Sequence, residues 1–160
     1  MDVEADYLKK LINNESPIIF DIGCYDGRDT LKLNSLFKDA QIYSFDADKR
    51  SLDLFRKMVC GFPNIELLEM ALSDVDGEIL FYESDSEEKR HYSDQTFWSA
   101  SSSIKEPDRH LDIFDNISFK SGKKIKSSRL DTWVDSRNFE TIDLMWVDVN
   151  GGECEFLHGA

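Results

Sequence analysis

Apolar residues along the chain follow two patterns that alternate. Mostly apolar runs end in an acidic residue at 18–21, 41–46 and 142–148, and the continuous run that begins at Ile18 is typical of a strand buried on both faces of a parallel sheet. After the first two runs, apolar residues recur at helical spacing over 30–37 and 49–59. This alternation predicts an α/β fold with a mostly parallel sheet.

The segment before the first strand predicts an amphipathic helix. Over 5–12, Leu8, Leu11 and Ile12 share one helical face. The polar residues and the proline that follow end the helix. We therefore expect 1–17 to form an N-terminal helix and a lead-in to the sheet.

The middle of the chain departs from simple alternation. Asp48 is a suitable N-cap for the helix that follows the second strand. We expect a third strand at 65–72 and an added strand of a β-ribbon at 78–82. A solvated polar loop should follow at 84–90. Further along, we expect a strand of solvated lysines at 123–128, and residues 129–134 should lead into a short helix.

The turn after the first strand carries the most informative motif. Asp21 ends the strand, and Gly23 and Gly27 follow it. Glycines let the backbone turn tightly and approach a ligand closely. The second strand ends in Asp46, and 46 − 27 gives 19 residues between the last glycine and this carboxylate. Nucleotide-binding βαβ units use this spacing to place an acid on a pair of ribose hydroxyls.

The positions of the glycines separate two classes of nucleotide. A dinucleotide motif starting at Gly23 would need glycines at 25 and 28, but Tyr25 and Arg28 stand there. A nicotinamide-dependent oxidoreductase is therefore disfavoured, although it stays open, as does a tight turn without a ligand. The remaining pattern, acid-x-Gly-x-x-x-Gly, is similar to the first motif of class I S-adenosylmethionine-dependent methyltransferases.

Composition limits the partners. The 160 residues suit one domain, 1–160, and 32 acidic against 19 basic residues give a formal charge of −13. Such a surface disfavours nucleic acid and anionic membranes, so a small or neutral partner is expected. No apolar run reaches the roughly 20 residues that a membrane-spanning helix needs. The acidic amino terminus also lacks the pattern of a secretory signal, so we expect a cytoplasmic location.

The cysteines do not indicate a metal site. Cys24, Cys60 and Cys154 are odd in number and lack close metal-ligand spacing. We expect them to be reduced and mostly buried thiols.

The last apolar run has the same arrangement as the first, with an acidic residue at its end and glycines after it. It ends in Asp148, and Gly151 and Gly152 follow. Because ligands of open α/β sheets bind beyond the carboxyl ends of the strands, we expect Asp21, Asp46 and Asp148 to project into one site. The aromatic and hydroxyl-rich segment 97–103 is either a loop pinned by its tryptophan or a loop that faces a substrate, and the pattern favours neither.

Together, these motifs resemble the FkbM family of S-adenosylmethionine-dependent methyltransferases, over about 18–160. The order and spacing of the motifs are more specific than any one of them. The matching pieces are 20–23 with 25–27, 44–46, 71–74 with Gly77, 101–103, 129–133, and 148–153 running into 157–160.

The resemblance implies a Rossmann-like class I methyltransferase fold with strands in the spatial order third, second, first, fourth. It also implies an O-methyltransferase that acts on a hydroxyl of a sugar or small metabolite. Asp148 would be the catalytic residue beside the sulfonium and the acceptor oxygen. The expected S-adenosylmethionine contacts are Asp21, Gly23, Cys24, Tyr25, Gly27, Asp46, Ala71 and Leu72, and the expected substrate contacts are Ser102, Ser103 and Asn150.

The chain departs from the family pattern at three positions. Asp46, Trp146 and Asn150 stand where the family usually has Glu, Lys and Glu. The sequence also ends in the helix after the fourth strand, where a complete sheet of this class continues. We therefore expect a fold truncated after the fourth strand, whose open edge could support a homo-oligomer.

One alternative follows from these departures. The chain could be a non-catalytic Rossmann-like binding or interaction domain. If it is catalytic, His91 and His110 are further candidate bases. A divalent ion held by Asp148 and Glu153 would be another way to acidify the acceptor, although the spacing does not require a metal.

Overall fold

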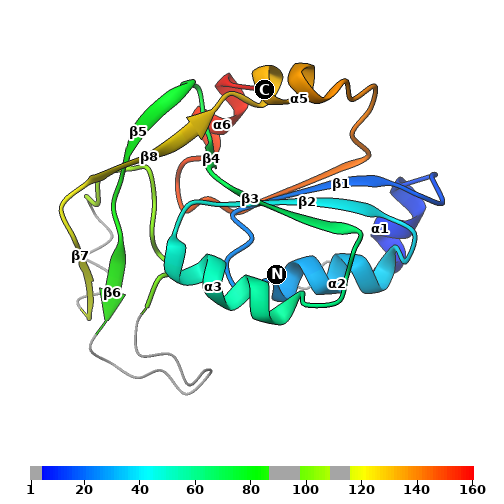
Figure 1. Cartoon of the computed structure of the whole chain (residues 1–160), viewed down its shortest axis with the longest axis horizontal. Coiled ribbons are helices and arrows are strands. Elements are labelled where there is room, and N and C mark those ends of the chain that lie inside the picture. The colour runs from blue at the N-terminus through cyan, green and yellow to red at the C-terminus, as the bar shows by residue number, and fades with distance from the viewer. Residues whose placement is uncertain (1–4, 87–97, 109–115) are drawn as a thin grey trace.

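The computed structural model describes residues 5–86, 98–108 and 116–160. Its centre is a sheet of four parallel strands, β1 (Ile18–Ile22), β2 (Gln41–Asp46), β3 (Ile65–Glu69) and β9 (Leu144–Val147). Their spatial order is β3-β2-β1-β9 (Figure 1), which confirms the predicted order third, second, first, fourth.

Helices cover both faces of this sheet (Figure 1). On one face lie α2 (Arg28–Leu36) and α3 (Lys49–Met58), with α1 (Ala5–Leu11) nearby, and on the other lie α5 (Leu130–Arg137) and α6 (Glu153–His158). The side chain of Asp48 accepts a hydrogen bond from Arg50 N, so the predicted N-cap of α3 is confirmed. None of the described helices is long and apolar enough to span a membrane.

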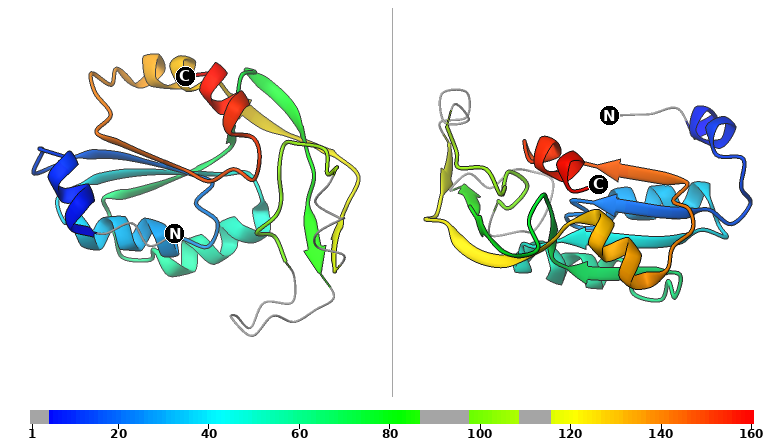
Figure 2. Two further views of the ribbon diagram at one scale, coloured as in Figure 1. Left: turned by 180° about the vertical axis from the view of Figure 1, so that it is seen from behind. Right: turned by 90° about the horizontal axis from the view of Figure 1, so that it is seen from above.

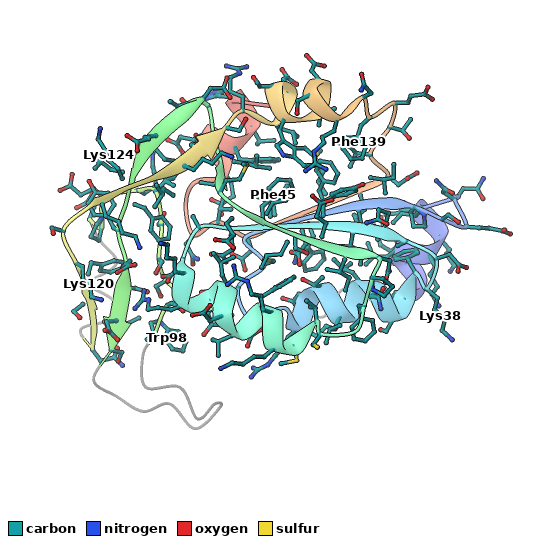
Figure 3. All side chains as sticks on the ribbon, viewed as in Figure 1. Lys38, Phe45, Trp98, Lys120, Lys124 and Phe139 are labelled. Atoms are coloured by element: carbon teal, nitrogen blue, oxygen red, sulfur yellow. The ribbon has the colours of Figure 1, made fainter. Side chains whose placement is uncertain are left out.

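Each face of the sheet has its own apolar cluster. Between the sheet and α5, Trp133 packs edge to face against Phe20 and Phe45, with ring centroids 5.4 and 5.0 Å apart. Phe45 and Phe139 lie in this layer (Figure 3). The opposite cluster joins α1 and α2 to the sheet through Leu8, Ile12, Ile19, Leu33, Phe37, Ala40 and Ile42.

Two smaller sheets lie beyond the carboxyl ends of the main strands (Figure 1). One has the order β4-β8-β5, formed by β4 (Ala71–Leu72), β8 (Lys123–Ser128) and β5 (Gly77–Phe81). The other pairs β6 (Ser84–Ser86) with β7 (Ile117–Phe119). The added β-ribbon is thus confirmed, with more strands than the sequence indicated.

Two element boundaries differ from the prediction. The expected third strand over 65–72 is interrupted at Met70, and the chain leaves the main sheet there because β4 pairs with β8. The expected solvated loop over 84–90 begins with β6, whose Ser84 is buried. In both places the pairing partner comes from a distant part of the sequence.

Burial also corrects three expectations. Leu11 is 61% exposed, whereas Leu8 and Ile12 pack against the sheet, so the helical face is narrower than predicted. Cys24 is buried, but Cys60 and Cys154 are exposed, and all three are free thiols. Met145 of β9 is 44% exposed. Among the described strands β9 pairs only with β1, at the edge of the sheet (Figure 2), so it is not buried on both faces.

Candidate functional site

A cavity opens at the carboxyl ends of β1, β2 and β9, between the main sheet and the smaller sheets. Its volume is about 180 Å³, well above the roughly 10–15 Å³ that one water molecule requires. All the residues predicted to contact cofactor or substrate line it except Gly27. The lining comprises residues 21–26, Asp29, 45–48, 70–72, Phe81, Ser99, Ala100, 102–104, Trp146 and 148–150.

Three residues of the turn after β1 have positive φ angles, in the left-handed region of backbone conformations. The φ angles of Gly23, Tyr25 and Gly27 are 86°, 49° and 87°. A Cβ on Gly23 would lie 1.9 Å from the carbonyl oxygen of Asp148, and one on Gly27 would lie 3.0 Å from the Phe55 ring. The glycines are therefore required by the protein's own packing, because they bring the turn against the end of β9 and against α3.

Asp46 connects the turn to the end of β2. Its Oδ2 accepts a hydrogen bond from Tyr25 N at 2.9 Å, and its Oδ1 accepts one from Asp48 N at 2.8 Å. Burial raises the pKa of Asp46 to about 6, against the lowering effect of these hydrogen bonds. Each carboxylate oxygen has lone pairs left to accept a ligand hydroxyl.

Asp21 lies at the bottom of the same site and is only 1% exposed. Thr30 Oγ1 donates a hydrogen bond to its Oδ2, whereas Oδ1 has no hydrogen-bond partner among the described residues. Burial, and to a smaller extent the nearby carboxylates Asp29, Asp46 and Asp148, raise the pKa of Asp21 to about 7. The lining of the cavity therefore includes a buried carboxyl group that has one side-chain hydrogen bond and no ion pair among the described residues.

Asp148 follows β9 and reaches the cavity from the other side of β1. Its backbone N–H donates to Ile22 O at 2.9 Å, which fixes the chain at this point. Its exposed carboxylate has no hydrogen bond or ion pair with any described residue. Asp148 is therefore available to a ligand. Asn150 follows in a left-handed conformation, with φ of 52°.

The two serines that were predicted to contact substrate form hydrogen bonds within the protein. Ser102 Oγ donates to Asp48 Oδ2 at 2.9 Å and accepts from Ser84 N at 3.0 Å. Ser103 Oγ donates to the carbonyl oxygen of Asn150 at 2.8 Å. Both residues line the cavity, but their hydroxyls fasten the segment that carries them. Of the two open interpretations of 97–103, the described part favours the pinned loop.

The sequence did not reveal the ion pair behind this segment. Asp48 binds Arg50 through Nε at 2.9 Å and Nη2 at 2.6 Å, and Arg50 Nη1 donates to Ser84 O at 2.9 Å. Ser51 and Ser99 add a hydroxyl contact at 3.0 Å, and Trp98 lies near the start of α3 (Figure 3). The sequence contained one indication of this ion pair. Asp48 was predicted to be the N-cap of α3, and Arg50 follows it by two residues, in the first turn of that helix.

The candidate metal ligands and alternative bases have other positions. Glu153 Oε1 accepts hydrogen bonds from Val149 N and Gly151 N, both at 3.2 Å, so it caps the turn after β9. Within the described ranges, no three His, Cys, Asp or Glu side chains cluster as a metal site would require. His91 and His110 lie outside the described residues.

The charged side chains that line the cavity, among the described residues, are all acidic. The described lining includes six carboxylates and no lysine, arginine or histidine. Three of the carboxylates have basic partners that lie outside the lining: Asp26 pairs with Arg28, Asp29 with Lys32 and Asp48 with Arg50. Asp21, Asp46 and Asp148 have no ion-pair partner among the described residues. The cavity is therefore suited to a neutral or cationic ligand.

Comparisons with known proteins agree with this architecture. Residues 21–160 match the model of the Methyltransferase FkbM domain. The chain is 33% identical over 149 residues to 2-O-methyltransferase NoeI of Sinorhizobium fredii, a match that covers 93% of this chain and 59% of that protein. The chain thus spans about three fifths of the length of this curated relative.

A solved structure shows a similar fold. The crystal structure of methyltransferase FkbM from Methylobacillus flagellatus aligns with 98% of this chain and 36% of its own, with a TM-score of 0.54 and 13% identity. Together with the parallel sheet and the helices on both faces, this establishes a Rossmann-like methyltransferase fold. The chain belongs to the FkbM methyltransferase family.

Proposed function

We propose that this chain is the cofactor-binding part of an S-adenosylmethionine-dependent O-methyltransferase that acts on a hydroxyl of a sugar or another small metabolite. One observation carries the proposal: Asp21, Asp46 and Asp148, from three strands of the sheet, line one cavity. Family membership supports methyl transfer, and the name 2-O-methyltransferase of the relative NoeI supports an oxygen acceptor.

The lining residues fit the parts of the cofactor. The turn of Gly23, Cys24 and Tyr25 and the buried Asp21 would hold the methionine end, with Gly27 fixing the turn from behind. Asp46 would accept hydrogen bonds from the ribose hydroxyls with its remaining lone pairs. Ala71 and Leu72 would contact the adenine through apolar surface.

The acceptor would enter beside Asp148. The bound cofactor supplies a methyl group activated by a sulfonium, so the protein mainly has to align the acceptor and exclude water. Asp148 would take the proton of the acceptor hydroxyl, because its carboxylate is unpaired and lines the cavity. Asn150 and the segment with Ser102 and Ser103 would form the wall on the acceptor side.

Two other functions have different support. A nicotinamide dinucleotide carries a pyrophosphate, and the described lining offers it six carboxylates without a basic side chain. The cavity therefore disfavours that cofactor. A non-catalytic binding domain is supported by Trp146 and Asn150, which stand where the resemblance leads us to expect charged residues.

Calorimetric titration separates these functions. We expect S-adenosylhomocysteine to bind and NAD not to bind. Asp46→Ala should weaken S-adenosylhomocysteine binding by about 1–3 kcal/mol, because charge-assisted hydrogen bonds are lost. Asp53→Ala, which removes an exposed carboxylate of α3, is the matched control. Binding of NAD alone, or wild-type affinity in Asp46→Ala, would contradict the assignment.

A turnover assay tests the catalytic part of the proposal. With a panel of methyl glycosides and small alcohols as acceptors, Asp148→Asn should lose most methylation while retaining S-adenosylhomocysteine binding, because the substitution keeps the shape and removes the basicity. Methylation at the wild-type rate would remove Asp148 from the chemistry. Cofactor binding without turnover on any acceptor would favour the non-catalytic domain.

Location and assembly belong to the same proposal. A small-molecule acceptor and the excess of acidic residues are consistent with a cytoplasmic enzyme that binds neither nucleic acid nor membrane. The edge of β9, with Met145 exposed, would allow association with a second copy. Sedimentation velocity measures this directly, and a monomer at all concentrations would argue against association through that edge.

A further inference from the structure

Asp21 and Asp148, two of the three carboxylates without ion-pair partners among the described residues, lie at the ends of neighbouring strands together with Trp146. Asp21 and Trp146 are register partners on adjacent parallel strands, and Asp148 lies two residues beyond Trp146. All three residues line the cavity. In a parallel sheet, register partners project to the same face, and so do residues two apart on a strand. This end of the cavity therefore combines two carboxylates with an indole.

Asp21 is the first feature that favours a positively charged ligand at this end. The residue is only 1% exposed, yet its Oδ1 has no hydrogen-bond partner among the described residues. Oδ1 is open to the cavity rather than enclosed by protein atoms, so a cation bound there would contact it directly and stabilise the charged form of the carboxyl group. The described lining provides no such cation itself.

Trp146 adds a second feature that favours cations. Its half-buried indole packs against the apolar cluster of α1 and α2 and lines the cavity as well. The face of an indole is the strongest aromatic partner for a cation, including cations that cannot donate hydrogen bonds. A sulfonium is a cation of this kind, since it has no N–H or O–H.

We propose that the Asp21, Trp146 and Asp148 end of the cavity recognises the sulfonium charge, so that the protein binds the methyl donor more tightly than the demethylated product. This inference rests on the proposed function and goes beyond it. S-adenosylmethionine and S-adenosylhomocysteine differ by one methyl group and one positive charge, and both carry the same amino acid and nucleoside. A site that only fitted those shared parts would not separate them.

Calorimetry with three ligands tests the inference. S-adenosylmethionine and sinefungin, in which a carbon bearing an ammonium replaces the methylated sulfur, should each bind roughly tenfold more tightly than S-adenosylhomocysteine. Raising the salt concentration should reduce this difference, because screening weakens the attraction of the carboxylates. Equal affinities, or tighter binding of S-adenosylhomocysteine, would overturn the inference.

Variants at Trp146 separate the charge effect from the packing. Trp146→Phe retains an aromatic face and should keep most of the preference. Trp146→Lys places a positive charge in the cavity and should weaken both cationic ligands by roughly tenfold while changing S-adenosylhomocysteine affinity less than about threefold. Loss of affinity for all three ligands to the same extent would show that Trp146 only shapes the cavity.

Matched carboxylate variants give a second, independent reading. Asp148→Asn should reduce the preference for the cationic ligands. Asp39→Asn removes one exposed carboxylate at the opposite end of the sheet, before β2, and should leave the preference unchanged. Equal effects of the two variants would mean that net charge alone determines the preference, and the local site would be refuted.

The outcomes also separate this inference from the proposed function. If all three ligands bind with the same affinity, the proposed function stands and the charge recognition is wrong. If none of them binds to the wild-type protein, both are wrong. The salt series does not depend on any variant folding correctly, so the inference can be tested even if Trp146→Lys is unstable.

Discussion

Asp46 and Asp48 lie two residues apart on the same turn, but the protein treats their charges in opposite ways. Burial raises the pKa of Asp46 to about 6. Burial acts on Asp48 too, but the hydrogen bonds and charge of Arg50 outweigh it and lower the pKa of Asp48. The difference is an internal cation, which Asp48 has and Asp46 lacks.

The same difference in charge compensation separates two regions of the molecule, one around Asp48 and one around Asp46. Asp48 and Ser102 belong to one wall of the cavity, and Arg50 and Ser84 support that wall from behind through hydrogen bonds and an ion pair. At the carboxyl ends of β1, β2 and β9, Asp21, Asp46 and Asp148 have no basic partner among the described residues. We infer that the first region stabilises the fold and that the second is kept for a ligand, at a cost in stability.

The largest effect on stability is expected in the wall. Arg50→Met would leave Asp48, whose side chain is 2% exposed, without its cation. Breaking a buried ion pair in this way should lower the free energy of unfolding by about 3–5 kcal/mol, measured by urea denaturation. Arg56→Met, which breaks exposed pairs with Asp53 and Glu69, is the control and should cost much less. A similar loss in both variants would mean that the wall is no more stabilising than the surface.

The next effect should appear where the turn meets β9. Gly23→Ala should destabilise the protein by about 2–4 kcal/mol, because the added Cβ would clash with the backbone of Asp148 and φ is 86°. Gly77→Ala is a matched control, since its φ is also positive, at 115°, but a Cβ would meet nothing within 4 Å. If the two variants lose equal stability, backbone strain alone explains the requirement at Gly23.

A smaller effect should appear in the pH dependence of stability. The folded state raises the pKa of Asp21 from 3.8 to about 7, so between these values it holds a proton that the unfolded chain has released. Stability should therefore fall as pH rises through this window, by roughly 1–3 kcal/mol, and Asp46 adds to the fall below about pH 6.

Asp21→Asn provides the comparison for that measurement. The variant cannot ionise at this position, and its amide oxygen can still accept from Thr30. Urea denaturation across the window should show a flatter pH dependence than in the wild-type protein. Asp39→Asn, the exposed control, should keep the wild-type slope. Identical slopes in the wild-type protein and Asp21→Asn would show that Asp21 does not titrate in this range.

The sequence predicted the second region better than the first. Asp21, Asp46 and Asp148 each follow an apolar run, and the carboxyl ends of parallel strands meet at one edge, so their convergence could be inferred from local pattern. The order of the main strands was implied by the family resemblance and not by the local pattern. The helix cap at Asp48 was also visible, because capping depends on neighbouring residues only.

The wall could not be predicted, because its contacts join residues far apart in the sequence. The bond from Ser102 to Asp48 spans 54 positions, and that from Arg50 to Ser84 spans 34. The break at Met70 has the same origin, since β4 leaves the main sheet to pair with the distant β8. Hydroxyl-rich segments give no periodic signal that distinguishes a pinned loop from a substrate-facing one.

The most direct test of the contrast between the two regions is the number of protons exchanged when S-adenosylmethionine binds. Calorimetry at about pH 6.5, in buffers of different ionisation enthalpy, measures it. If the ligand's positive charge lies among Asp21, Asp46 and Asp148, the raised pKa values of Asp21 and Asp46 should fall on binding and protons should be released, and Asp21→Asn should release fewer. Binding without proton release, or with proton uptake, would contradict the claim that these carboxylates are kept for a cationic ligand.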